Sequence, residues 1–577
     1  MHVIATAGHV DHGKSTLVKA LTGADPDRLE EERRRGLSIE LGYVWTTLDP
    51  VGEVAFVDVP GHERFLRTML AGVGPVPAVL LVVAADDPWM PQAAEHLAAL
   101  DALGVRHGVV AVSRSDLADP APMLARARDE VERTTLRGAP VVAVSGVTGA
   151  GLDDLRMALV ELVRSVGSPS PDADVRLWVD RLFHVRGSGT VVTGTLPAGT
   201  VAVGDRLTTG DGSVRVRGVQ SLGRPREAVS SVARVALNVV GDDAGLARDS
   251  VLVTPGGWHF TETVDVRLGD GEGRVPEQSD LHVGAVGVPT RLRPFDETTA
   301  RLTLTRPLPL RVGDRALLRD PGSRRVWGVT VLDPAPPQLR RRGAGARRAR
   351  LLATATGRSS LDEELDRRGV VSTRLLRQIG VPVPADADEW LVGAEAADLA
   401  RARMLDVVKT YDDEHPLAPG MPVPALARAL ALPSPDLITR LVAEPLRLEA
   451  GRVTSTPPRT GLPDEIERAV RTLEDDLADA PFEAPTADRL RELGLHPKAI
   501  GVAARAGRLL DLGSGIVLLP GADLVAARWL AELDQPFTTS AARQRLATTR
   551  RVVLPLLARL DSRSLTTRHP DDRRSVR

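Results

Sequence analysis

The stretch GHVDHGKSTL, Gly8 to Leu17, decides the fold at the start of this 577-residue chain. It follows the apolar run HVIATA, residues 2–7, and it opens a segment with helical spacing. Its first eight residues have the pattern G-x-x-x-x-G-K-[ST], whose glycines let backbone N–H groups close around phosphate oxygens. The stretch therefore predicts a strand, a phosphate-binding loop and the beginning of a helix.

The residues around this loop alternate between apolar runs and amphipathic segments. Segments such as AAEHLAALDAL, residues 93–103, have helical spacing. The apolar runs are rich in β-branched residues: EVAFVDV at 53–59, AVLLVVAA at 78–85, GVVAVS at 108–113 and PVVAVS at 140–145. This alternation is typical of a parallel sheet with helices on both faces, so residues 1–170 are predicted to form an α/β P-loop domain.

The composition limits both the number of domains and the available chemistry. A chain of this length is too long for one hydrophobic core, so we expect several domains. It contains no cysteine, which excludes disulfides, thiolate catalysis and zinc sites built on cysteine. No apolar run is as long as a membrane span, and the first residues lack the pattern of a signal peptide, so we expect a cytoplasmic protein without membrane contacts.

Glycine and proline divide the rest of the chain. The linker VGSPSPDAD, residues 166–174, ends the first domain, and short alternating strands follow it. They predict two β-barrels, at residues 174–256 and 257–335. After the basic segment LRRRGAGARRAR, residues 339–350, four helix-turn-helix patterns with strand-like tails predict tandem α+β winged helices. Their predicted bounds are 336–398, 399–458, 459–522 and 523–577.

The last predicted winged helix is strongly basic. From Gln535 to the end there are ten arginines against three acidic residues. The segment ATTRRVVLPLLARL places Thr549 at the start of a helix, where backbone amides also favour phosphate. We expect this module to contact RNA, whereas the first two winged helices are equally well explained as spacers, and the basic segment at 339–350 as a flexible linker. The candidate RNA-binding residues are Arg543, Arg545, Arg550, Arg551, Arg573 and Arg574.

A second motif near the phosphate-binding loop defines a nucleotide site. DVPGH, Asp58 to His62, directly follows another apolar run. With both motifs present, Lys14 is predicted to reach the β- and γ-phosphates, and the N–H of Gly61 to sense the γ-phosphate. Mg²⁺ is predicted to be held by the hydroxyl of Ser15 and, through water, by Asp58.

Together, GHVDHGKSTL, RGLSIELGY (35–43), DVPGHERFLRTML (58–70) and MPQAAEHL (90–97) resemble the translational GTPases related to elongation factor Tu. The resemblance extends to VRGSGTVVTGTL, residues 185–196, which matches the hairpin that supports the aminoacyl end of tRNA in that family. It implies that His62 positions the attacking water, and that Val10 and Leu37 form an apolar gate in front of it. Ser38 stands where the family usually has threonine, and its hydroxyl is expected to bind Mg²⁺ in the same way.

The base-recognition stretch VVAVSRSDL, residues 109–117, departs from the usual Asn-Lys-x-Asp. Asp116 keeps the carboxylate that accepts from the two donors of guanine, and wrong bases leave such a carboxylate unpaired. Ser113 makes fewer bonds than asparagine, and Arg114 is expected to cover the base with its planar guanidinium. We therefore predict a GTPase with softened nucleotide affinity that exchanges GDP for GTP without a helper protein. The predicted nucleotide-binding residues are His9, Val10, Asp11, His12, Gly13, Lys14, Ser15, Thr16, Asp58, Gly61, Ser113, Arg114, Asp116, Ser145, Gly146 and Val147.

The long C-terminal extension resembles one branch of this family, the bacterial selenocysteine-specific elongation factors. The branch implies delivery of selenocysteinyl-tRNA to the ribosome at UGA codons, and a grip on an mRNA hairpin by the last winged helices. It also implies a selenocysteine pocket at Asp180, Arg181 and Arg234, with His184 as a weaker candidate. Charge is a sensible discriminator, because a selenol is largely an anion at neutral pH, whereas a thiol of pKa about 8.5 costs roughly 2 kcal/mol to deprotonate at pH 7.

Two other interpretations remain open from the sequence. One is a different tRNA-delivery GTPase with an unrelated extension. The other is a GTP-gated RNA- or DNA-binding regulator, in which the C-terminal modules do the work. In every case we expect a monomer with GTP or GDP and Mg²⁺ as its cofactors.

Overall fold

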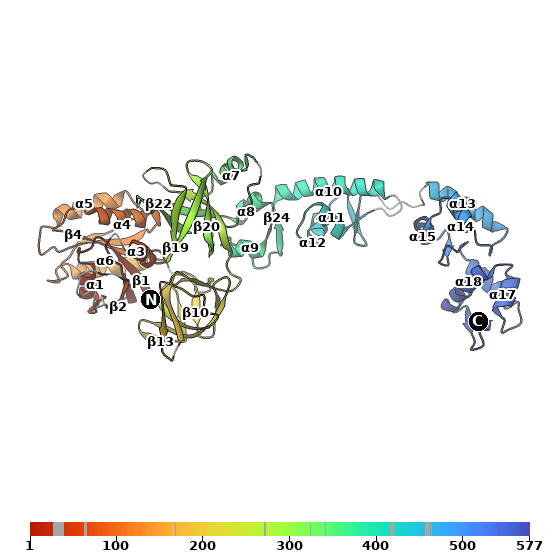
Figure 1. The fold of residues 1–577 in the computed structure, drawn as a ribbon, viewed down its shortest axis with the longest axis horizontal. Helices are drawn as coiled ribbons and strands as arrows, with labels where there is room; N and C mark the ends of the chain where they lie inside the picture. The colour runs from red at the N-terminus through yellow and green to blue at the C-terminus, as the bar shows by residue number, and fades with distance from the viewer. Residues whose placement is uncertain are drawn as a thin grey trace. The chain divides into compact units, whose positions relative to one another are not determined.

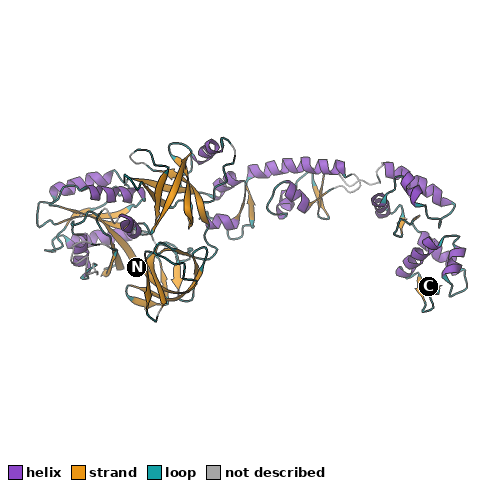
Figure 2. Cartoon of the chain, viewed as in Figure 1, coloured by secondary structure: helices purple, strands orange, loops and turns teal. Residues whose placement is uncertain are grey.

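The computed structural model describes residues 1–577 except 27–37, 39, 63–65, 168, 188, 270–272, 324, 341, 416–419, 456–461 and 463. The predicted gate residue Leu37 therefore lies outside the described residues. The chain divides into two compact units, Met1–Leu391 and Val392–Arg577. Figure 1 shows the elements of both units in chain order, and Figure 2 shows strands dominating the middle of the first unit and helices the second.

The first domain is the predicted α/β P-loop fold. Its six strands lie in the order β2-β3-β1-β4-β5-β6, and β2 is antiparallel to β3 while the other neighbours are parallel. The strands are β1 (His2–Ala7), β2 (Gly42–Leu48), β3 (Gly52–Asp58), β4 (Ala78–Ala84), β5 (His107–Ser113) and β6 (Val141–Ala143). The central strand β4 is buried along its whole length, as expected for a sheet covered on both faces.

Helices cover both faces of this sheet. They are α1 (Lys14–Thr22), α3 (Leu66–Val73), α4 (Pro91–Ala102), α5 (Ala121–Glu132) and α6 (Leu152–Ser165). Side chains of α3, α4 and α5 form the core on one face, and those of α1 and α6 form the core on the other. Because the strands are parallel, the loops at their carboxyl ends meet along one edge, where the two nucleotide motifs lie.

The second domain is an antiparallel β-barrel domain built around its own apolar core. The main sheet runs in the order β7-β16-β11-β12-β15-β9-β8, with β13 beside β12, and β10 pairs with β14. Its strands are β7 (Arg176–Trp178), β8 (Arg181–Val185), β9 (Gly189–Leu196), β10 (Thr200–Ala202), β11 (Arg206–Thr208), β12 (Ser213–Ser221), β13 (Arg224–Arg226), β14 (Ala228–Ser230), β15 (Ala233–Gly241) and β16 (Val251–Val253). Hairpin β8-β9 is the one predicted from VRGSGTVVTGTL.

The third domain is a closed barrel in the order β17-β20-β19-β18-β21-β22. The strands are β17 (Phe260–Leu268), β18 (Gln278–Val283), β19 (Val286–Pro294), β20 (Thr299–Pro309), β21 (Arg315–Arg319) and β22 (Val326–Asp333). Closure leaves no free sheet edge. Buried valine and leucine side chains fill its interior.

The first unit continues beyond this barrel with a small helical module. Its elements are α7 (Ala344–Leu352), α8 (Leu361–Arg368), β23 (Val370–Ser372), α9 (Thr373–Gln378) and β24 (Trp390–Val392), with β23 pairing with β24. Ser360 and Glu363 form a capping box that fixes the beginning of α8. The basic segment predicted as a linker is therefore helical from Ala344 onward.

The second unit contains three further helical modules with short β-hairpins or ribbons. Their elements are α10 (Ala394–Glu414), β25 (Met421–Pro422), α11 (Val423–Ala429), α12 (Asp436–Leu441), β26 (Arg447–Glu449) and β27 (Arg452–Thr454); then α13 (Asp464–Ala478), α14 (Ala487–Glu492), α15 (Pro497–Arg505), β28 (Leu510–Asp511) and β29 (Val517–Leu518); then α16 (Ala522–Ala531), α17 (Thr539–Arg545), α18 (Arg550–Ser562), β30 (Thr566–Arg568) and β31 (Arg574–Val576). Helices α17 and α18 with hairpin β30-β31 form the predicted terminal winged helix.

Two predicted module boundaries are wrong by a few residues. The boundary at 398/399 falls inside α10, and that at 522/523 falls after the first residue of α16. Gly393, which caps α10, precedes the first, and Gly521, which caps α16 in a left-handed conformation, precedes the second. Both errors arise because the apolar spacing at a helix start is weak. The predicted boundary at 458/459 lies outside the described residues.

In the part of the chain that the structure describes, no helix combines the length and the apolar character needed to cross a membrane.

Candidate functional site

Backbone conformation shapes the phosphate-binding loop between β1 and α1. Gly8 has φ 132°, and a side chain there would lie 2.1 Å from the carbonyl oxygen of Val82. Gly13 caps α1 with φ 77°. The ammonium of Lys14 donates to the carbonyls of Gly8, at 3.1 Å, and His9, at 2.7 Å, so its charge lies inside the loop where phosphate oxygens would sit.

The predicted Mg²⁺ ligands converge at the carboxyl end of β3. The hydroxyl of Ser15 donates to Asp58 Oδ2 at 2.6 Å and lies 3.1 Å from the hydroxyl of Ser38. Asp58 is fully buried and also accepts from Thr6 at 2.6 Å, which holds its second oxygen. One carboxylate and two hydroxyls in contact are oxygen ligands of the kind that Mg²⁺ takes beside nucleotide phosphates.

A cavity of about 350 Å³ lies over this loop. Twelve of the predicted nucleotide-binding residues line it, and the remaining four, His9, His12, Asp58 and Ser145, do not. The lining consists of Val10, Asp11, Gly13, Lys14, Ser15, Thr16, Leu17, Ser38, Gly61, Ser113, Arg114, Asp116, Leu117, Gly146 and Val147. The sequence motifs missed Leu17 and Leu117, which add apolar walls to a site predicted from its polar groups.

The base-recognition end of the cavity is built from the loops after β5 and β6. The buried hydroxyl of Ser113 donates to the carbonyl of His12 at 2.6 Å, so it ties this loop to the phosphate-binding loop. The Oγ of Ser145 accepts from the N–H of Val147 at 3.3 Å and so shapes its own loop, a supporting role behind the lining. Arg114 donates to the carbonyl of Asp11 and pairs with Asp86 at 3.1 Å, which holds its guanidinium at the rim.

His62 and Val10 flank the phosphate end. A side chain on Gly61 would lie 2.4 Å from Lys14 Nζ and 2.5 Å from the backbone nitrogen of Val10, so the loop of DVPGH touches the phosphate-binding loop. His62 follows directly and is half-buried, but it does not line the cavity. Its role as the residue that orients water therefore stays a prediction.

Two buried histidines lie at the phosphate-binding loop, His12 within it and His96 in contact with it. His96 on α4 accepts from the N–H of Gly8 through Nδ1 at 2.9 Å, and burial lowers its pKa to about 3. Burial likewise lowers the pKa of His12 to about 4. Both rings are therefore neutral at physiological pH, and the neutral Nδ1 of His96 can accept the bond that fixes Gly8. In the sequence, His96 lies in MPQAAEHL, residues 90–97, which carries part of the family resemblance, but no role was predicted for it.

Three residues predicted to line the amino-acid pocket, Asp180, Arg181 and Arg234, form a cluster of polar contacts where the first barrel meets strand β2. Asp180 is buried and receives both terminal nitrogens of Arg234, one of them at 2.6 Å. Thr193 donates to Asp180 at 2.8 Å and accepts from Arg234 at 3.0 Å. The guanidinium of Arg234 also lies 3.8 Å from the ring centre of Tyr43, whose hydroxyl is 3.4 Å from Asp180.

Arg181 carries the charge that this cluster does not neutralise internally. Its guanidinium donates to the carbonyl of Leu41, lies 3.2 Å from Glu40 and faces the ring of Tyr43 at 5.1 Å. All three partners belong to the segment that leads from the nucleotide site into β2. Burial raises the pKa of Tyr43, so its hydroxyl stays protonated and available as a donor. Tyr43 contacts this cluster, and the sequence motifs did not predict it as a member.

His184 lies apart from the other pocket candidates. It pairs with Thr190 across hairpin β8-β9, whereas Arg181 pairs with Thr193. Alternate residues of a strand point to opposite faces, so His184 and Arg181 leave β8 on different sides. Nδ1 of His184 lies 3.1 Å from the hydroxyl of Thr190, which donates to Asp243 at 2.5 Å. The prediction that His184 lines this pocket is therefore wrong.

A second cavity, of about 370 Å³, lies on the same barrel beside the β8-β9 hairpin. Phe183 and Val185, both near 40% exposed, form one apolar wall, and Val191 extends it. Arg217, Gln220 and Asn238 add polar groups from β12 and β15. An exposed aromatic ring with amide and cationic groups around it suits a nucleic-acid base, which has both an apolar face and polar edges.

The predicted RNA-binding arginines of the terminal module differ in exposure and in their contacts. Two are exposed on helices, three contact a carboxylate or backbone carbonyls, and one is buried. Arg543 and Arg550 are exposed on α17 and at the first turn of α18. Arg545 pairs with Glu532, Arg551 reaches carbonyls of Pro485 and Gly515 at 3.4 Å, and Arg573 lies 3.5 Å from Asp571.

Arg574 is buried and bonded to Asp561 at 2.9 Å. Its prediction as an RNA-binding residue is therefore wrong, because the hairpin turns it into the module's interior.

A GTP-binding domain with a phosphate-sensing loop, followed by two β-barrels, defines a translational GTPase. Residues 1–165 match the elongation factor Tu GTP binding domain, and residues 528–575 match the winged helix of elongation factor SelB. The chain is 30% identical to the selenocysteine-specific elongation factor of Desulfomicrobium baculatum, over 99% of each chain, and 32% identical to that of Escherichia coli K12, over 99% of this chain and 98% of the other. The crystal structure of a bacterial selenocysteine-specific elongation factor has the same fold, with a TM-score of 0.77 and 23% identity over both full chains. The chain belongs to the family of selenocysteine-specific elongation factors.

Proposed function

We propose that this protein carries selenocysteinyl-tRNA in a GTP-dependent manner to the ribosome at UGA codons. The observation that carries the proposal is the bonding of Arg181 and Arg234 to the segment that follows the nucleotide site. The carbonyl of Leu41, Glu40 and the ring of Tyr43 all contact this pair. A change at the γ-phosphate that moves this segment therefore changes what the two guanidiniums can bind.

The nucleotide site supports hydrolysis by positioning and charge. Bound Mg²⁺ would be held by Ser15, Ser38 and, through water, Asp58, and it would neutralise charge on the phosphate oxygens. Lys14 lies inside the loop and binds the β- and γ-phosphates. Asp116 at the cavity wall is proposed to select guanine. His62, next to Gly61, is proposed to orient the attacking water when GTP is bound.

The amino-acid pocket favours an anion because Asp180 neutralises the buried Arg234, whereas the carboxylate beside Arg181 is that of the partly exposed Glu40, which an incoming anion can replace. Burial by itself lowers the pKa of Arg234, but Asp180 more than offsets this, so the pKa is raised and the guanidinium stays charged. A selenolate that displaces Glu40 from Arg181 gains a charge-assisted contact. A neutral serine hydroxyl does not, and size alone distinguishes such small groups by only about 1–3 kcal/mol.

The cavity beside hairpin β8-β9 is proposed to take the terminal base of the tRNA. Phe183 offers a stacking surface, Gln220 offers donors and acceptors for a base edge, and Arg217 faces the adjoining phosphates. The terminal winged helix is proposed to hold an mRNA hairpin through Arg543 and Arg550. Sequence-specific RNA recognition generally targets unstacked bases in loops, which a helix start with backbone amides and nearby arginines suits.

The test compares one tRNA charged with selenocysteine or with serine. The full-length protein is titrated with each species in the presence of GTP and of GDP. The proposal predicts tight binding of selenocysteinyl-tRNA with GTP only, and at least tenfold weaker binding of the seryl form. Equal affinity for the two species, or binding that ignores the nucleotide, contradicts it.

A further inference from the structure

The basic segment after the second barrel has an unusual charge balance. Residues 334–361 contain seven arginines and no aspartate or glutamate. A free chain with this composition would be a flexible tail. The structure instead holds the segment against the barrel at three points. Its arginines are therefore held in fixed positions.

The first and last of these points are backbone carbonyls held by barrel arginines. Arg301 donates to the carbonyl of Pro337 at 2.9 Å, before α7 begins. Arg267 donates to the carbonyls of Leu352 and Ala353 at 2.9 Å, where α7 ends. Both ends of the segment are therefore fixed to the barrel.

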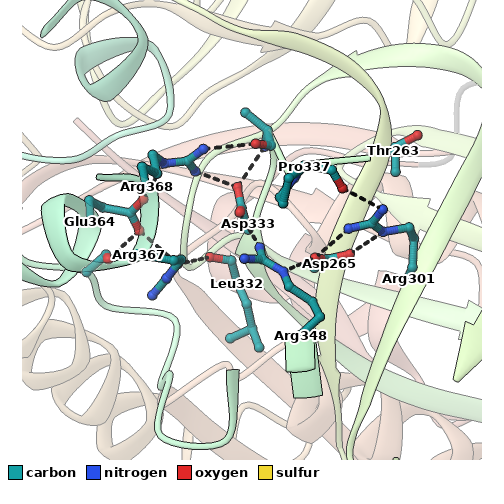
Figure 3. A network of polar contacts seen from close by, with 12 residues as sticks. Thr263, Asp265, Arg301, Leu332, Asp333, Pro337, Arg348, Glu364, Arg367 and Arg368 are labelled. Atoms are coloured by element: carbon teal, nitrogen blue, oxygen red, sulfur yellow. Dashed lines mark hydrogen bonds and ion pairs between the residues drawn. The ribbon is translucent and has the colours of Figure 1, made fainter. Parts of the chain in front are cut away.

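The middle point is a buried ion-pair network, shown in Figure 3. Arg348 donates through Nε to Asp265 at 2.7 Å and also bonds Asp333, and both carboxylates are fully buried. Arg368 from α8 bonds Asp333 at 2.6 Å. One arginine of the segment thus serves as its anchor, and the helix cannot turn about its own axis without breaking the network.

Anchoring α7 by Arg348 directs other arginines outward. Arg347 and Arg350 are three residues apart, on neighbouring positions of the helix surface, and both are exposed. Arg342 precedes the helix and is also exposed. Among the residues that the structure describes, none of these three forms an ion pair or a side-chain hydrogen bond.

We propose that Arg342, Arg347 and Arg350 form a fixed ridge that binds phosphates of the tRNA carried by the first unit. Clustered cations on a rigid surface repel each other until a polyanion neutralises them, and a fixed surface loses little conformational freedom when it binds. The ridge belongs to the same compact unit as the amino-acid pocket, whereas the terminal winged helix belongs to the other unit. The RNA held by the pocket is therefore its ligand, and this inference rests on the proposed function.

The test is the full-length triple variant R342Q/R347Q/R350Q, measured with GTP across a range of salt concentrations. Binding of selenocysteinyl-tRNA is expected to weaken at least several-fold. The slope of log affinity against log salt is expected to fall by about two to three units, roughly 0.7–0.9 for each phosphate that the variant no longer neutralises. A matched control removes the same charge from the first domain: R128Q/R133Q/R137Q changes three exposed arginines in or just after α5. The control is expected to leave both quantities unchanged.

Measuring the binding of an mRNA hairpin to the same variants shows whether the ridge binds phosphates of the tRNA or of the mRNA. The inference predicts no change in hairpin binding by the ridge variant. A variant that binds tRNA with unchanged affinity and salt slope overturns the inference, and so does one that loses hairpin binding instead. If the unaltered protein binds charged tRNA without regard to GTP, the proposed function fails, and that result is distinct from a failure of the ridge.

Discussion

Two buried clusters in the first unit are both built from aspartate and arginine, and they differ in where their bonding partners come from. We call the cluster around Asp265 and Asp333 the closed network, because its described partners all belong to one part of the chain. Around Asp265 and Asp333, every bonding partner that the structure describes comes from the second barrel, from α7 or α8, or from the chain between them, and each carboxylate is fully buried (Figure 3). Around Asp180, the arginine bonds are shared with Thr193 and the ring of Tyr43, and Tyr43 belongs to a strand of the nucleotide-binding domain.

This difference separates a structural network from a candidate binding site. Buried ions stabilise a fold only when good geometry and further hydrogen bonds repay the loss of water. The Asp333 network meets that condition with side chains that are buried and fixed within the second barrel and the helices packed on it. In the Asp180 cluster, Arg234 is held by Asp180 and Thr193 of the barrel, whereas the partners of Arg181 come from the segment after the nucleotide site. We therefore expect Arg181 to become available when that segment moves.

The largest expected effect comes from breaking the closed network. Asp333→Ala leaves Arg348 and Arg368 buried without one of their carboxylates. The local stability of β17, β22 and α7 is expected to fall by about 3–5 kcal/mol, since losing one partner of a buried pair leaves an uncompensated charge. Hydrogen exchange of these elements in the full-length protein measures this.

The control for this change is an exposed ion pair on the same barrel. Glu277→Gln breaks the ion pair with Arg291, in which both side chains are mostly exposed. Its cost is expected to stay below about 1 kcal/mol. Equal effects of the two substitutions would show that the Asp333 network contributes no more than a surface pair.

The second-largest effect comes from replacing one arginine by methionine in each of the two clusters, which compares their roles directly. Arg181→Met is expected to weaken binding of selenocysteinyl-tRNA by about ten- to a hundredfold, because it removes the guanidinium proposed to meet the selenolate, and a hydrogen bond to a charged group contributes roughly 1.5–3 kcal/mol. Binding of the seryl form is expected to change little. Arg301→Met in the closed network should lower stability and leave this preference intact. Loss of preference in both variants contradicts the division of roles.

The fold and the nucleotide site were largely predictable from sequence, for a physical reason. Phosphate binding uses backbone amides and a few side chains within short motifs, so Gly8 to Ser15 and Asp58 to Gly61 carry most of the information locally. Tyr43 and Arg348 could not be found in this way. Tyr43 meets Arg234 only after the barrel packs on β2. Arg348 finds Asp265, 83 residues earlier, only once the barrel has closed.

In the terminal winged helix, too, the sequence predicted local features but not which side chains are buried. Its basic character and the helix start at Thr549 were predicted correctly. Arg573 and Arg574 are adjacent in sequence, yet one is exposed and the other is buried against Asp561. Alternation along a short hairpin decides which side each residue takes, and the sequence did not fix the register of that hairpin.

The smallest effect is a pH dependence confined to the closed network. Burial alone would raise the pKa of Asp333, but Arg368 and Arg348 more than offset it, so the pKa lies below its ordinary value. A lowered pKa in the folded state contributes stability above the unfolded value of about 3.9, and this contribution disappears as pH falls through the folded value. The stability difference between the unaltered protein and Asp333→Asn should therefore shrink as the pH is lowered below about 4. Urea unfolding of both proteins at several acidic pH values measures it, and a constant difference would contradict the ionised state of Asp333.

The most direct test of the central claim, that the Asp180 cluster reads charge and not size, uses the same tRNA charged with cysteine. Cysteine nearly matches selenocysteine in shape, but its thiol has a pKa of about 8.5. Affinity is measured with GTP between pH 7 and pH 9.5 for the cysteinyl and selenocysteinyl forms. The account predicts that cysteinyl-tRNA binds progressively more tightly as its thiol ionises, while selenocysteinyl-tRNA changes little, so that the two affinities converge. Parallel curves across this range would contradict it.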